Sequence, residues 1–141
     1  MGCDIHLVLE RKHPTYGWVG TDSFQIHHAI DGKYCFPAAL ERNYRLFAAL
    51  AGVRGDGPEP RGVPEDASAL TRMLVDDWSG DGHSHSWLPL AEAAQEFNKR
   101  RWPEEGQAAM KSFRDSYPAS FWFGVENETL EEHRLIFWFD N

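Results

Sequence analysis

The sequence has 141 residues, of which 42% are hydrophobic, and its formal net charge is −8. This length predicts a single domain spanning residues 1–141. The absence of clustered lysine and arginine argues against long nucleic acids as partners, and no run of roughly 20 apolar residues could span a membrane. With no signal-peptide pattern and only two cysteines, we expect a cytoplasmic protein with reduced thiols.

The first predicted elements are strands. Alternating residues over 4–11 place Ile5, Leu7 and Leu9 on one face of a strand, and Asp4 and His6 on the other. Pro and Gly at residues 13–17 predict a turn, and residues 18–20 and 23–27 predict two short strands.

Four helices are predicted to follow. Their ranges are 37–51, about 68–78 after a cap at Asp66 or Ser68, 90–101, and 103–116. Residues 54–64 and 79–87 are rich in Gly, Pro or Ser and predict loops. Aromatic stretches at 120–125 and 134–140 predict the last strands. The fold class is therefore α+β: a small, mostly antiparallel sheet built from N- and C-terminal strands, with about four helices inserted between.

The second loop contains the densest group of reactive side chains. Asp81, His83 and His85 stand within five residues, and Gly80 and Gly82 would let a ligand approach the backbone closely. In an extended segment the two histidines would project to one face and could share a metal ion or a phosphate group. The alternative is an ordinary solvated loop.

Asp4 and His6 form a second acid–imidazole pair, two residues apart in a strand. The alternative is a solvent-facing strand surface. We expect this pair to fold against the loop that carries Asp81, His83 and His85. Together these five residues are the predicted catalytic group. They would either hold a divalent ion such as zinc or manganese, or act without a metal as proton donors and acceptors.

Basic and aromatic residues flank these groups. Arg42, Arg45 and Arg54 stand on or just after the first predicted helix, and arginine forks match phosphate oxygens. A solvated helix surface is the alternative for them. Ser86 and Trp87 follow the histidines and are candidates for positioning a substrate, with Trp87 as a stacking platform.

Several blocks of the sequence resemble a group of small phage and bacterial proteins. The blocks are the Met-Gly-Cys-Asp-Ile-His start, Arg42–Arg54, Gly62–Asp66, Asp81–Trp87 and the Phe-Asp-Asn ending. The resemblance implies a bacterial or phage cytoplasm and carries no defined activity or catalytic residues. Some phage proteins of this size cleave or sequester the cyclic nucleotide signals of host defence.

These observations lead to one expected function and two alternatives. We expect a phosphodiester hydrolase acting on a small anionic nucleotide, such as a cyclic nucleotide defence signal, through the His/Asp cluster. A non-catalytic nucleotide-binding sponge would use the same residues. An inhibitor of a host protein would instead use the acidic surface, including residues 126–132. No membrane partner is expected, and a homo-oligomer is compatible with the sequence.

Overall fold

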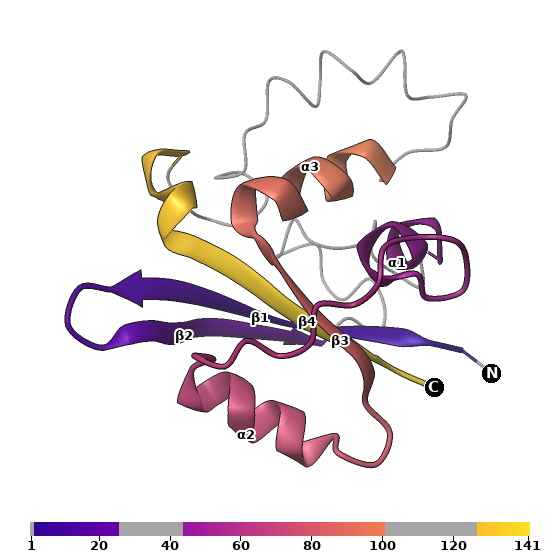
Figure 1. The fold of residues 1–141 in the computed structure, drawn as a ribbon, viewed down its shortest axis with the longest axis horizontal. Helices are drawn as coiled ribbons and strands as arrows, with labels where there is room; N and C mark the ends of the chain where they lie inside the picture. Colours follow the sequence, from indigo (N-terminus) through magenta and orange to yellow (C-terminus); the bar gives the residue numbers. More distant parts are fainter. Residues whose placement is uncertain (1, 26–43, 101–126) are drawn as a thin grey trace.

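The computed structural model describes residues 2–25, 44–100 and 127–141 (Figure 1). Its centre is an antiparallel four-stranded sheet with the strand order β2-β1-β4-β3. The strands are β1 (Asp4–His13), β2 (Gly17–Gln25), β3 (His83–Pro89) and β4 (His133–Asp140). The predicted α+β class and antiparallel sheet are therefore confirmed.

The prediction of four helices is not matched. The described residues form three α-helices, α1 (Tyr44–Ala51), α2 (Ala69–Asp77) and α3 (Leu90–Arg100), and a 3₁₀ helix, η1 (Asn127–Glu132). The fourth predicted helix, 103–116, lies outside the described residues, as do the first part of the helix predicted over 37–51 and the strand predicted over 120–125.

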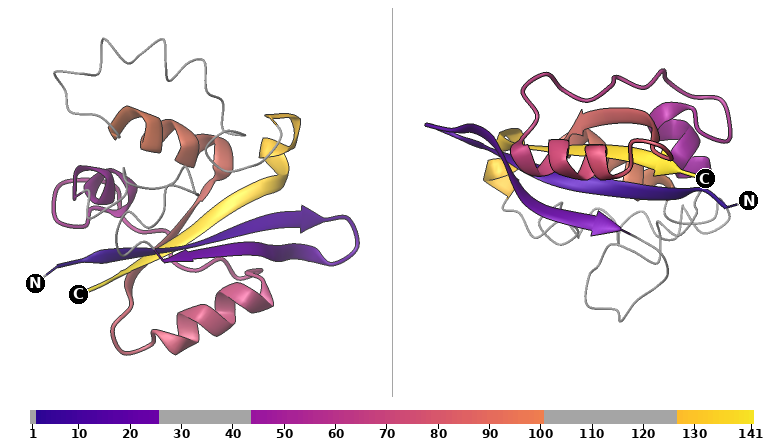
Figure 2. Two further views of the ribbon diagram at one scale, coloured as in Figure 1. Left: turned by 180° about the vertical axis from the view of Figure 1, so that it is seen from behind. Right: turned by 90° about the horizontal axis from the view of Figure 1, so that it is seen from below.

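The sheet separates two layers of helices. In Figure 1 and in the reverse view of Figure 2, α1 and α3 lie on one side of the sheet and α2 on the other. We call these sides the inner face and the outer face. Within the described residues, no helix is long and apolar enough to cross a membrane.

The first and last strands form the central pair of the sheet. Asp4 stands opposite Asp140 and Arg11 opposite His133, so the two ends of the described chain lie side by side (Figure 1). Because side chains alternate along a strand, this register puts Ile5 and Phe139 together on the inner face. His6 and Trp138 are placed together on the outer face in the same way.

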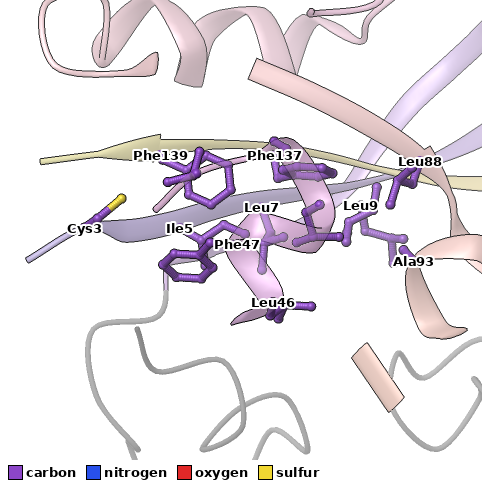
Figure 3. Packing of buried hydrophobic residues seen from close by; sticks show 14 of the residues in the cluster. Cys3, Ile5, Leu7, Leu9, Leu46, Phe47, Leu88, Ala93, Phe137 and Phe139 are labelled. Atoms are coloured by element: carbon purple, nitrogen blue, oxygen red, sulfur yellow. The ribbon is translucent and has the colours of Figure 1, made fainter. Parts of the chain in front are cut away.

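The hydrophobic core fills the inner face (Figure 3). Phe47 of α1 is fully buried and meets Phe139 edge to face, with 5.1 Å between ring centroids. Helix α1 ends where predicted, because Gly52 takes a left-handed φ of 67° and its N–H donates to the carbonyl of Ala48. This end of α1 leads directly into the candidate site.

On the outer face, a buried carboxylate fastens α2 to the sheet. Glu10 of β1 is fully buried and accepts hydrogen bonds from the N–H of Ser68 at 2.7 Å and the hydroxyl of Thr71 at 2.6 Å. Ser68 is the N-cap of α2, one of the two caps predicted, and its hydroxyl accepts from the N–H of Thr71. Arg134 of β4 donates to the same carboxylate. Burial raises the pKa of Glu10, but these hydrogen bonds together lower it below its usual value.

The segment predicted as a loop over 79–87 is instead a turn followed by β3. Strand β3 is at the edge of the sheet, and the chain between α1 and α2 lies alongside it. There the N–H of Gly62 donates to the carbonyl of His85, and the N–H of Arg61 donates to the hydroxyl of Ser86. The Gly- and Ser-rich sequence did not predict this strand. Strand β3 is stabilised by its pairing with β4 and by the loop that covers its edge, and neither contact can be read from the local sequence.

Candidate active site

A β-bulge at the start of β3 decides where the two predicted histidines point. His83 stands opposite Phe139 and Ser86 opposite Phe137, so three steps on β3 match two steps on β4. One extra residue reverses the alternation of side chains. His83 therefore contacts Phe139 of the inner face, and His85 stacks on Trp138 of the outer face. The expectation that both histidines project to one face is wrong.

On the outer face, two histidines flank one tryptophan. The rings of His6 and Trp138 stack with centroids 5.6 Å apart, and those of His85 and Trp138 stack with centroids 6.1 Å apart. Trp78, which follows α2, covers His6 with a centroid distance of 4.3 Å. His6 and His85 therefore lie on the same face of the sheet, with Trp138 between them.

The imidazoles of His6 and His85 are in different environments. Nε2 of His6 lies 2.6 Å from Oδ2 of Asp140, and His6 is only 3% exposed. Burial, followed by the nearby charge of His83, lowers the pKa of His85, which favours its neutral form. A buried, carboxylate-bound His6 is suited to holding the sheet together rather than to contacting a substrate.

The two predicted acids, Asp4 and Asp81, belong to different elements. Asp4 stands opposite Asp140 at the end of the sheet, whereas Asp81 is exposed in the turn before β3. Among the described residues, no group of three or more His, Cys, Asp or Glu side chains is arranged to hold a metal ion. The described part of the chain therefore offers no ready-made version of the predicted five-residue metal centre.

An open pocket of about 430 Å³ lies where the end of α1 meets the start of β3 and the end of the chain. This volume is within the range typical of small-ligand sites. The side chains that provide its chemistry are Arg54, His83 and Ser84, and the remaining lining residues are Gly52, Val53 and Asn141. Two predicted site residues, Arg54 and His83, are brought together here. We call this site the Arg54–His83 pocket.

Arg54 is exposed at this pocket and contacts the first residue of α1. Its guanidinium lies over the Tyr44 ring, 5.5 Å from the centroid, and its backbone has a left-handed φ of 62°. The same guanidinium acts on the buried Cys3. Burial raises the pKa of the Cys3 thiol, and the charge and hydrogen bond of Arg54 only partly oppose this effect. The thiol therefore stays protonated near neutral pH.

Ser84 is the pocket residue that sequence reasoning missed. Its hydroxyl lies 2.9 Å from Nδ1 of His83, and its backbone has a left-handed φ of 54°. No sequence signal identifies it, because its orientation results from a bulge that exists only when β3 pairs with β4. Asp140 was missed for a similar reason, since its contact with His6 depends on the register of β1 and β4.

The remaining predicted substrate-binding residues lie elsewhere. Arg45 is exposed on α1 and does not line the pocket, and Arg42 lies outside the described residues. Ser86 is buried and accepts a hydrogen bond from the N–H of Arg61. Trp87 contacts the guanidinium groups of Arg61 and Arg134, which lie 5.4 and 5.9 Å from its ring centroid. Ser86 and Trp87 therefore fix the loop along β3.

Comparison with known proteins adds no relatives. No family model matches the sequence, and no curated protein or solved structure shows a significant similarity to it.

Proposed function

We propose that the protein binds a small anionic ligand of the nucleotide class in the Arg54–His83 pocket and hydrolyses a phosphoester bond in it. The observation that carries this proposal is the meeting of an exposed guanidinium and an imidazole at one open pocket. An arginine fork pairs with phosphate oxygens, and histidine is the usual proton donor and acceptor near neutral pH.

The charge distribution supports a local anion site in an acidic protein. The chain carries 22 acidic and 14 basic residues, so a phosphate group would be repelled by the protein as a whole. Arg54 provides positive charge at the rim of the pocket, and the Tyr44 ring restricts where it can move. A guanidinium held in this way loses less freedom when it binds an anion.

His83 rather than His6 or His85 is the proposed acid–base group. It lines the pocket, whereas His6 is buried against Asp140 and His85 stacks on Trp138. The sequence analysis assigned the acid–base chemistry to a group of five residues. The proposal assigns it to His83 alone, with Arg54 lining the same pocket. A metal ion of the predicted kind is not required by this arrangement, and activity measured with and without a chelator tests that point.

The experiment is a binding and turnover assay with a panel of linear and cyclic nucleotides. We expect calorimetry to detect binding of at least one member, and chromatography of the released ligand to show a hydrolysed phosphoester. Because hydrogen bonds to charged groups contribute about 1.5–3 kcal/mol, Arg54→Ala should weaken binding by roughly 10- to 100-fold.

Arg11→Ala is the matched control, because it removes the same charge from an exposed side chain that pairs only loosely with Glu132, at 3.7 Å. Its affinity should equal that of the unchanged protein. If the released nucleotide is intact, the protein is a nucleotide-binding protein and not a hydrolase. This alternative uses the same pocket. Equal affinities of the Arg54→Ala and Arg11→Ala variants would contradict the proposed site.

A further inference from the structure

We propose that Ser84 is the nucleophile of the Arg54–His83 pocket and that the reaction passes through a phosphoserine intermediate. This inference rests on the proposed function and adds a covalent step to it. Its basis is the 2.9 Å distance between the Ser84 hydroxyl and Nδ1 of His83, in a pocket that both residues line. A hydroxyl within hydrogen-bond reach of an imidazole is the arrangement in which a serine becomes reactive.

The backbone gives an independent reason to single out Ser84. Among the described residues, only two non-glycine residues have a positive φ, Arg54 at 62° and Ser84 at 54°. Both line the same pocket, although 30 positions separate them in the sequence. Unfavourable backbone conformations persist where the surrounding structure enforces them, and they concentrate at functional sites. The bulge in β3 is one such structure, since bulges redirect side chains.

The two ring nitrogens of His83 have different surroundings. Its Nε2 atom is buried and has no hydrogen-bond partner among the described residues. Nδ1 is the nitrogen that faces the serine hydroxyl. When Nε2 carries the ring proton, Nδ1 is free to accept the proton of Ser84. In this tautomer the proton of Ser84 moves to Nδ1.

The proposed reaction has two balanced steps. In the first, Oγ of Ser84 forms a bond to phosphorus and its proton moves to Nδ1 of His83. The bond between phosphorus and the leaving alcohol breaks, and the alcohol oxygen takes the proton from His83. In the second, water attacks the phosphoserine, gives its proton to His83, and Ser84 leaves and recovers that proton. Arg54 neutralises the non-bridging oxygens throughout.

A fluorophosphate probe tests the nucleophile without knowledge of the natural substrate. Diisopropyl fluorophosphate reacts with an activated serine by forming an O–P bond and releasing fluoride. We expect mass spectrometry of the full chain to show one adduct, and peptide mapping to place it on Ser84. Ser84→Gly, which tolerates a positive φ, should abolish the adduct. His83→Gln should slow its formation by about 10²- to 10⁴-fold.

Ser79→Ala is the control, because Ser79 is exposed in the turn before β3 and does not line the pocket. Its labelling should match that of the unchanged protein, and thermal melts should show that all variants are folded. Labelling at another serine, or labelling that His83→Gln leaves unchanged, would overturn the inference.

Turnover of bis(4-nitrophenyl) phosphate separates this inference from the proposed function. We expect a burst of one equivalent of 4-nitrophenol in rapid-quench experiments, with the remaining 4-nitrophenyl phosphoryl group esterified to Ser84. Hydrolysis that persists in Ser84→Gly would remove Ser84 as the nucleophile and leave a hydrolase in which water attacks directly. If the unchanged protein neither hydrolyses this diester nor reacts with the fluorophosphate, both proposals fail.

Discussion

Glu10 and Arg134 form an ion pair inside the protein, with Nε and Oε1 2.7 Å apart and side chains 0% and 5% exposed. The pair joins β1 to β4 and, through the bonds of Glu10 to Ser68 and Thr71, joins the sheet to α2. Arg134 also donates to the carboxylate of Asp66 at 2.9 Å and lies over the Trp18 ring. This network connects the start of α2 to the outer face through polar contacts.

Removing the buried carboxylate should destabilise the fold. Glu10→Ala leaves the Arg134 guanidinium and the Ser68 N–H without their buried partner, and we expect the free energy of unfolding to fall by about 3–5 kcal/mol. Denaturant titration followed by circular dichroism measures this change. The control is Glu132→Ala, which removes half of an exposed pair with 55% and 52% exposed side chains. It should cost less than about 1 kcal/mol, and a similar loss in the two variants would contradict the role given to Glu10.

The contact between Asp140 and His6 leads to a second prediction. Asp140→Ala removes the oxygen 2.6 Å from Nε2 of an imidazole that is only 3% exposed. An unsatisfied buried polar group costs about 1–3 kcal/mol, so the free energy of unfolding should fall by that amount. Asp81→Ala changes an exposed turn residue and should alter stability by less than about 0.5 kcal/mol. Equal effects of the two substitutions would show that the buried pair does not stabilise the protein.

Stability should fall as the pH is lowered, and in two stages. Burial holds the pKa of His85 below its ordinary 6.5, so the unfolded chain binds a proton more readily and stability declines as the pH falls below that value. The pKa values of Glu10 and Asp66 are also lowered, from 4.5 and 3.8, so their contributions are complete above those values and are lost at lower pH.

The first stage can be assigned by substitution. His85→Phe keeps an aromatic ring against Trp138 but removes the titrating group. Chemical denaturation at several pH values between 7.5 and 5 should show a decline for the unchanged protein and a flatter profile for this variant. Parallel profiles for the two proteins would contradict the assignment to His85.

The loop that carries Arg54 depends on a close backbone contact at Gly57. A Cβ atom added there would lie 1.7 Å from the carbonyl oxygen of Ala48 in α1. Because both sides of this contact are backbone, Gly57→Ala should cost about 1–3 kcal/mol, measured by thermal or chemical unfolding. Gly80→Ala, where nothing lies within 4 Å, should change stability by less than about 0.5 kcal/mol. If Gly57→Ala leaves stability unchanged, the loop can move away from α1 and the proposed backbone contact is not required.

The elements that sequence reasoning found are those with local physical causes. The alternation of Ile5, Leu7 and Leu9 predicted β1, the predicted cap at Ser68 begins α2, and the first predicted helix ends at residue 51 as expected. These signals act over a few residues, through side-chain alternation and unsatisfied backbone groups at helix ends. The aromatic stretch over 134–140 predicted β4 in the same way.

The candidate site was decided by contacts between distant parts of the chain. The register of β1 against β4 placed Asp140 beside His6, although 134 positions separate them. The bulge in β3 separated His83 from His85, and the end of α1 brought Arg54 to His83 and Ser84. Residue types alone do not encode a register, a bulge or a meeting of loops, because these follow from packing the whole sheet. The sequence thus supplied the reactive side chains, and the tertiary structure determined which of them meet.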